Sequence, residues 1–141
     1  IGFVITNSDI HGIKHEVAKN TGIKFKDAIK TFIDDFKDAS LLVAHNIAFD
    51  RNVLASEMYR HGLLPEIETF LSVPIFCTSI GCTKITNIKY NEYELKQPKL
   101  KELYAHLFKS QPTGLHDALQ DTRILGMCFF ELLNRKLIQF E

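Results

Sequence analysis

The feature that most constrains the fold is a pair of segments that each place a carboxylate in the first turns of a predicted amphipathic helix. In the first, a short apolar run at Ser40–His45 leads into a helical pattern that carries Asp50. In the second, His116 precedes Asp121 by five residues at the start of the last apolar-periodic run. A short apolar run between two helical patterns is typical of a strand buried on both faces, which predicts an α/β fold.

Two such carboxylates and a histidine suit phosphodiester hydrolysis that depends on divalent metal ions. The reaction needs an in-line hydroxide and positive charge near the phosphate oxygens, and two Mg²⁺ or Mn²⁺ ions supply both. These hard ions prefer oxygen ligands, so Asp50 and Asp121 are the candidate metal ligands and catalytic acids. His116 is the candidate general base, because histidine titrates near neutral pH and Asp121 leans back toward the start of its helix.

Each piece taken alone also has an ordinary structural explanation. The helix dipole alone favours a carboxylate at the position of Asp50. His116 alone suits a surface or capping position, and Asp117 beside it is a plausible N-cap. We expect His45 to close the strand end as a hydrogen-bonded histidine and not to bind a metal.

The order of these motifs resembles that of a known family. The pattern His-Asn-x-x-Phe-Asp at residues 45–50, followed by His-x-x-x-x-Asp at residues 116–121, is similar to the second and third motifs of the DnaQ-like exonucleases of the DEDDh type. His11-Gly12-Ile13, residues 98–104 and the final helix match in the same order. The resemblance therefore covers nearly the whole chain.

The resemblance implies a ribonuclease-H-like fold, in which helices flank a central mixed β-sheet. It implies a metal-dependent 3′→5′ exonuclease that shortens single-stranded or frayed DNA by one nucleotide at a time, as in proofreading. It further implies that four residues contact the terminal nucleotide: His11, Ile13, Asn46 and Phe49. The ring of Phe49 would also pack inward. From the residues alone, His11 and Gly12 suit a capped tight turn equally well.

One departure from the family pattern bears on the catalytic prediction. The family's first motif, an Asp-x-Glu that supplies two of the four metal carboxylates, does not occur in these residues. If Ile1–Thr6 is the family's third strand, this motif lies about 20 to 30 residues upstream. We therefore expect residues 1–141 to be one exonuclease domain that lacks its first strands. Such a chain would expose an apolar edge at residues 41–44, and it would be poorly soluble and inactive by itself.

Two other classes of function stay open. A chain that truly lacks the first motif would be a non-catalytic module that binds nucleic acid or a DNA polymerase. The same carboxylate site also suits an exoribonuclease, since contacts to the 2′-hydroxyl distinguish RNA from DNA. Residues 80–97 interleave lysines with tyrosines, which is typical of single-strand binding but also of ordinary exposed loops.

The composition narrows these possibilities. The length of 141 residues fits one domain, and 17 basic and 17 acidic residues give zero formal charge. This argues against a scaffold that coats nucleic acid, but not against a nuclease whose metal ions neutralise phosphates. We expect an intracellular protein, cytoplasmic or nucleoid-associated, with reduced cysteines and no membrane contact. The spacing of Cys77 and Cys82 does not suit zinc, and buried thiols are the better interpretation.

Periodicity and turn residues predict the remaining elements. Val53 and Leu119 are expected to face the core from their helices, whereas Asp34 and Asp35 are expected to be solvated. The predicted strands are Ile1–Thr6, Ser40–His45 and Ser72–Thr78. The predicted helices are His15–Asn20, Phe25–Ala39, Asn46–Gly62, Pro98–Phe108 and Asp117–Lys136.

Overall fold

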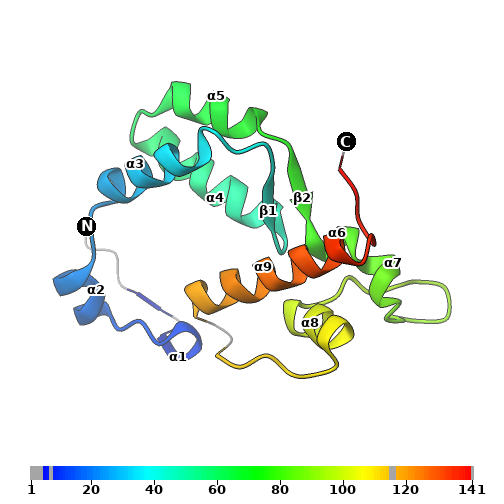
Figure 1. The fold of residues 1–141 in the computed structure, drawn as a ribbon. Coiled ribbons are helices and arrows are strands. Elements are labelled where there is room, and N and C mark those ends of the chain that lie inside the picture. The colour runs from blue at the N-terminus through cyan, green and yellow to red at the C-terminus, as the bar shows by residue number, and fades with distance from the viewer. Residues whose placement is uncertain (1–4, 7, 115–116, 141) are drawn as a thin grey trace.

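The structure is a computed structural model that describes residues 5–6, 8–114 and 117–140. Its described elements follow the chain in the order shown in Figure 1. They are α1 (Ser8–His11), α2 (His15–Thr21), α3 (Phe25–Phe36), β1 (Leu42–Ala44), α4 (Ile47–Arg60), α5 (Leu64–Ser72), β2 (Ile75–Cys77), α6 (Thr78–Gly81), α7 (Thr83–Thr86), α8 (Leu100–Phe108) and α9 (Ala118–Asn134).

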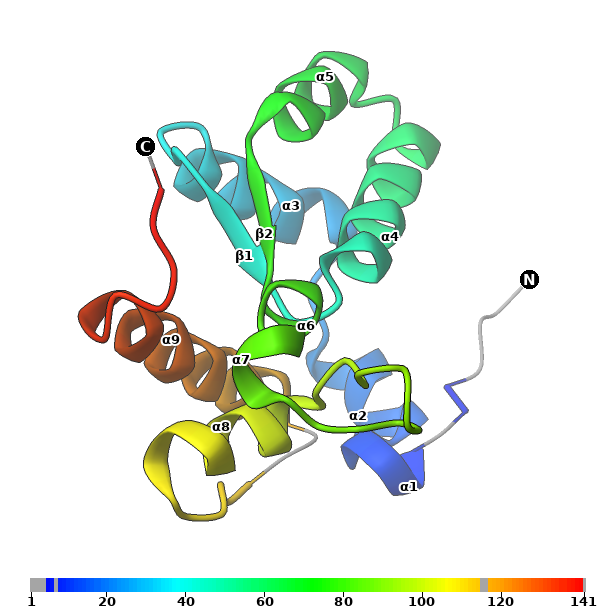
Figure 2. The same ribbon diagram turned by 90° about the vertical axis from the view of Figure 1, so that its right-hand side faces the viewer.

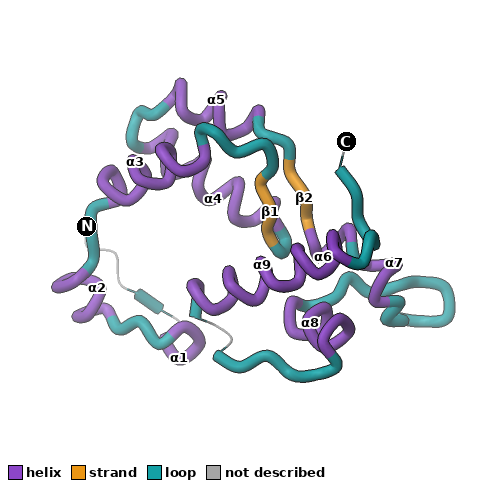
Figure 3. Tube along the Cα trace, viewed as in Figure 1, coloured by secondary structure: helices purple, strands orange, loops and turns teal. Residues whose placement is uncertain are grey.

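Two short parallel strands form the centre of the described fold. Leu42 of β1 pairs with Ile75 of β2, and Ala44 pairs with Cys77 at the other end. The helices α4 and α5 connect the two strands, as a parallel pair requires. Figure 3 shows the strands side by side, with their carboxyl ends leading into α4 and α6. The α/β arrangement predicted from the apolar runs is therefore confirmed.

The helices α3, α4 and α5 cover one side of the strands (Figures 1 and 2). Their shared core is rich in aromatic side chains, because α3 carries apolar residues at three- and four-residue steps. Phe32 and Phe36 of α3 each contact the ring of Phe70 from α5, with centroids 5.8 and 5.4 Å apart. Leu42 of β1 packs against this core.

A second core lies between α8 and α9. Its buried members are Cys82, Leu103, Leu107, Ile124, Cys128 and Leu132. Burial raises the pKa of Cys82 to about 11 and that of Cys128 to about 12, which keeps both thiols protonated. The interpretation as a buried small side chain is confirmed for Cys82 but not for Cys77, which is only half-buried because it lies at the end of β2. Phe76 of β2 joins the sheet to this half of the molecule through ring contacts with Phe129 and Phe140.

The N-terminal segment has no fully buried residue in either helix, α1 or α2. The helix predicted at His15–Asn20 is present, and Gly22 follows it as expected. The strand predicted at Ile1–Thr6 lies mostly outside the described residues, and Ile5 and Thr6 belong to no strand.

The structure corrects several details of the sequence prediction. β1 is half-buried along its length and not fully buried, because β2 is its only partner among the described residues. Val53 and Leu119 are exposed, at 47% and 57%, so the apolar stripes of α4 and α9 are narrower than predicted. Pro98 precedes the N-cap Lys99 of α8 and does not begin the helix. The helices α1, α5, α6 and α7 were not predicted.

No helix within the described residues is both long and apolar enough to cross a lipid bilayer.

Candidate active site

A cavity of about 480 Å³ opens at the carboxyl end of β1, between the first turns of α4 and α9. Ligands in α/β folds bind at this end of the strands, where loops and helix starts converge. The cavity brings together residues that are far apart in the chain. Its lining consists of Val43, Ala44, His45, Asp50, Leu100, Ala118, Asp121, Thr122 and Leu125.

Asp50 lies in the first turn of α4 and contributes one carboxylate to the cavity. The turn is placed by Asn46, which adopts a left-handed conformation (φ 72°) between β1 and α4. Burial raises the pKa of Asp50 above its usual range, although a hydrogen bond from its own backbone opposes this shift. A raised pKa means that the anionic form lacks compensation by a nearby positive charge. A bound cation would supply that compensation.

Asp121 contributes the second carboxylate from the first turn of α9 and is half-buried. The start of this helix is fixed by its N-cap, because Oδ1 of Asp117 accepts a hydrogen bond from the backbone N–H of Gln120 (2.9 Å). The backbone N–H of Asp121 donates to the carbonyl of Asp117 (2.8 Å). The prediction that Asp117 is an N-cap is confirmed.

His116, the predicted general base, lies outside the described residues. It immediately precedes Asp117 in the chain, and Asp117 is the described N-cap of the helix that carries Asp121.

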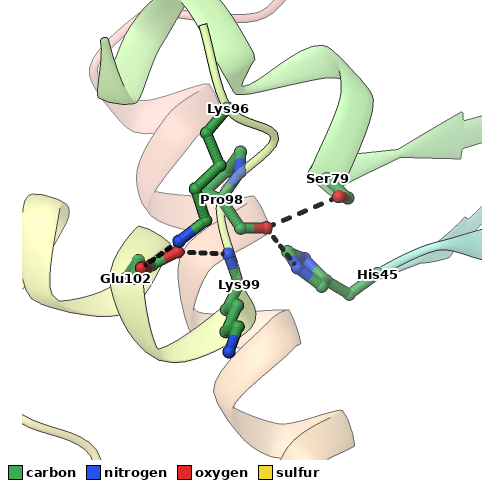
Figure 4. Close-up of polar contacts among 6 residues, drawn as sticks. All are labelled: His45, Ser79, Lys96, Pro98, Lys99 and Glu102. Carbon is green, nitrogen blue, oxygen red and sulfur yellow. Dashed lines mark hydrogen bonds and ion pairs between the residues drawn. The ribbon is translucent and has the colours of Figure 1, made fainter. Parts of the chain in front are cut away.

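His45 closes the end of β1 with both of its ring nitrogens engaged (Figure 4). Nε2 lies 2.8 Å from the carbonyl oxygen of Pro98, and Nδ1 lies 2.9 Å from the hydroxyl of Thr78. The hydroxyl of Ser79 donates to the same Pro98 carbonyl (3.4 Å). The expectation that His45 is a hydrogen-bonded histidine at the strand end is confirmed.

The four residues expected to contact a terminal nucleotide do not line this cavity. His11 ends α1, where Nδ1 accepts from the backbone N–H of Ile13 (3.1 Å) and Nε2 lies 3.3 Å from the carbonyl of Thr6. Gly12 has a φ of 72°, so the capped tight turn suggested by the residues is present. Ile13 is 50% exposed.

Asn46 and Phe49 flank the first turn of α4 on its solvent side. Asn46 is exposed, and its side chain makes no capping hydrogen bond to the helix. Phe49 is 66% exposed, so the expectation that its ring packs inward is wrong. The described sheet consists of β1 and β2 alone, and no described element covers the ring of Phe49.

The cavity is chemically suited to a hard divalent cation, because Asp50 and Asp121 line it from two different helices and such cations prefer carboxylate oxygens. Across the part of the chain that the structure describes, no group of three or more His, Cys, Asp or Glu side chains is arranged to hold a metal ion. The described residues therefore supply two acids, Asp50 and Asp121, to such a site.

Comparison with known proteins assigns the family. The model of the Exonuclease family (RNase_T) matches residues 4–129, which include Asp50, His116 and Asp121. The chain belongs to the Exonuclease family. No curated protein and no solved structure gives a significant match. The resemblance to DnaQ-like exonucleases and the ribonuclease-H-like fold class are thereby confirmed, and the described strands and helices of this exonuclease chain are compatible with part of that fold.

Sequence reasoning missed the polar residues that connect His45 to the rest of this exonuclease chain. Thr78 and Ser79 are buried at the carboxyl end of β2, beside the end of β1. Two hydroxyl residues directly after a strand were the available signal, because the ends of parallel strands meet at one edge of a sheet.

Proposed function

We propose that this chain acts as a metal-dependent 3′→5′ exonuclease that removes terminal nucleotides from single-stranded or frayed DNA. The observation that carries the proposal is the shared cavity of Asp50 and Asp121, which lie on different helices at the carboxyl end of β1. Membership of the Exonuclease family supports a nuclease, and the choice of DNA and of the 3′ end rests on the resemblance of its motifs.

Asp50 and Asp121 would hold Mg²⁺ or Mn²⁺, together with ligands that the described residues do not supply. When bound, the ions supply positive charge beside the scissile phosphate and a site where water ionises at neutral pH. The raised pKa of Asp50 supports this role, because partial burial of this otherwise exposed residue disfavours its anionic form in the absence of a cation.

A two-ion site needs more carboxylates than the two that line this cavity, and in the resembling family the Asp-x-Glu motif supplies them. Among the described residues β1 pairs with β2 alone.

The remaining residues have roles that follow from their chemistry. His116 would accept a proton from the attacking water, because histidine is the side chain type suited to a general base at neutral pH and this residue directly precedes the cap of α9. Ile13 and Phe49 are exposed apolar side chains against which a terminal base would stack, and His11 and Asn46 are their polar neighbours.

The test is an exonuclease assay on the full-length protein with 3′-labelled and 5′-labelled oligonucleotides in Mg²⁺ or Mn²⁺. We expect stepwise loss from the 3′ end, and we expect Asp121→Asn and His116→Ala each to lower turnover by about 100-fold or more with little change in melting temperature. Unchanged turnover in either variant would refute its assigned role.

Matched DNA and RNA oligonucleotides separate the two substrate classes in the same assay. A faster rate on RNA would favour an exoribonuclease, which the carboxylate pair serves equally well.

A non-catalytic module is the second candidate function, because two described carboxylates are fewer than a tight two-ion site requires. A non-catalytic module would bind oligonucleotides but would not cleave them in the presence of any divalent metal ion tested.

A further inference from the structure

His45 connects three segments of the chain through its two ring nitrogens. It follows β1, its Nδ1 contacts Thr78 at the start of α6, and its Nε2 contacts the carbonyl of Pro98 just before α8. Pro98 and Thr78 are fully buried and His45 is half-buried, so these contacts are partly shielded from water. Figure 4 shows the ring of His45 pointing from the strand end directly at the Pro98 carbonyl.

The partners of His45 fix its tautomer. The carbonyl of Pro98 can only accept, so Nε2 carries the proton and donates to it. Nδ1 then accepts the hydroxyl proton of Thr78 in the neutral ring. Burial lowers the pKa of His45 despite the opposing influence of the Pro98 carbonyl and Glu102, which favours this neutral form.

The contact with Pro98 reaches α9 through α8. The backbone N–H of Lys99 donates to Oε2 of Glu102 (2.7 Å), and Nζ of Lys96 donates to Oε1 of the same carboxylate (2.6 Å), which together hold the start of α8. Figure 4 shows Lys96 and Lys99, which flank Pro98 in the chain, both in contact with Glu102. The helix α8 then packs against α9 around the buried Leu103 and Ile124.

The two ends of this connection are the two acidic walls of the cavity. On one side, His45 is bonded through a short turn to α4 and Asp50; on the other, α8 supports the helix that carries Asp121. Leu100 of α8 lines the cavity together with His45 and both acids.

We infer that His45 is a positioning residue that holds the wall carrying Asp50 and the wall carrying Asp121 together, so that both carboxylates face the same metal-binding cavity. This inference rests on the proposed metal-dependent function. His45 itself makes no contact with substrate or metal in this role, and its influence passes through Pro98 and α8.

The test is backbone NMR of the full-length protein, as in the exonuclease assay, during titration with Mn²⁺, whose paramagnetism broadens amide signals near the bound ion. In the unsubstituted chain, signals around Asp50 and Asp121 should broaden together at the same metal concentration. In His45→Ala, the two groups of signals should lose this concerted behaviour. His45→Gln should restore it, because its amide can still donate to the Pro98 carbonyl.

His61→Ala is the matched control. His61 is also half-buried and stacks on Phe25 with ring centroids 4.9 Å apart, but it follows α4 at the end opposite to Asp50 and does not line the cavity. It should lower the melting temperature without separating the two groups of signals. Concerted broadening in His45→Ala equal to that in His61→Ala would overturn the positioning role.

Failure of the metal site itself gives a different result. If Mn²⁺ broadens neither group in the unsubstituted chain, the proposed function loses its basis, and amide exchange decides the positioning role. His45→Ala must then accelerate exchange in the first turns of α8 and α9, at Leu103 and Gln120, more than His61→Ala does. Equal acceleration in both variants would refute the inference.

Discussion

At the scale of single residues, the pKa of Asp50 distinguishes it from an ordinary acid at a helix start. The helix dipole favours a carboxylate in the first turn, and this alone would lower its pKa. Asp50 as a whole is exposed, but its pKa is raised, because partial burial in the cavity wall disfavours the anion more than its backbone hydrogen bond favours it. The partly desolvated anion is a small cost to the metal-free chain, of a kind common at functional sites.

This cost predicts a pH-dependent effect of Asp50→Asn on stability. The folded pKa exceeds the unfolded one, so the stabilising contribution of the protonated acid is present below the unfolded pKa and is lost as pH rises through the folded pKa. In metal-free buffer, the variant should gain free energy of unfolding relative to the unsubstituted chain as pH rises toward neutrality.

Urea unfolding at a series of pH values between 3 and 7 (roughly the carboxyl titration range) measures this difference. Asp34→Asn is the control, because Asp34 is exposed on α3 and pairs only weakly with Lys37 at 3.7 Å. A pH-independent difference for Asp50→Asn would show that the cavity does not desolvate its carboxylate.

At the scale of elements, the parts predicted from the sequence are those whose pattern is long or sharply bounded. α3 and α9 carry apolar residues over three or more turns, and β1 is an apolar run bounded by polar residues, so each was predicted near its observed position. The sequence analysis did not predict α5, although Pro65 in its first turn was an available signal.

In the candidate site, too, the residues that could be predicted are those that belong to a clear helix pattern. Asp50 and Asp121 were placed because each follows a recognisable helix start. The exposure of Phe49 was not predictable, because it depends on which elements cover α4 and not on the pattern of the helix itself. The contact between His45 and Pro98 joins positions 53 residues apart, which no local pattern reveals.

The cap of α9 gives a prediction at this scale. Asp117→Ala removes the acceptor for the backbone N–H of Gln120, and it should lower the free energy of unfolding by about 1 kcal/mol. It should also fray the turn that carries Asp121. Chemical unfolding measures the first effect, and Asp117→Asn, which keeps the acceptor, is the control. Equal stability of the Ala and Asn variants would contradict the cap.

At the scale of the whole molecule, the described residues form two separate apolar cores and also leave an apolar surface exposed on α9. One core joins α3, α4 and α5, and the other joins α8 and α9. The outer face of α9 presents Leu119, Met127 and Phe130 to solvent, and their spacing places them on one side of the helix. An exposed apolar stripe of this kind favours self-association.

We therefore expect Phe130→Ser to raise the solubility of the chain with a change of less than about 0.5 kcal/mol in its free energy of unfolding, because the ring is 69% exposed. Analytical ultracentrifugation over a concentration series measures association. Leu132→Ala, on the buried side of the same helix, should instead lower the free energy of unfolding by about 2 to 5 kcal/mol. A soluble, monomeric unsubstituted chain at high concentration would contradict this view of the surface.

The most direct test of the central claim is a double-mutant cycle on the affinity for Mn²⁺, using Asp50→Asn, Asp121→Asn and the combined variant in calorimetric titrations. If both carboxylates serve one metal site, the loss in the combined variant will differ from the sum of the single losses by more than about 0.5 kcal/mol. Strictly additive losses, or affinity unchanged by either substitution, would show that the two acids do not serve a common metal site.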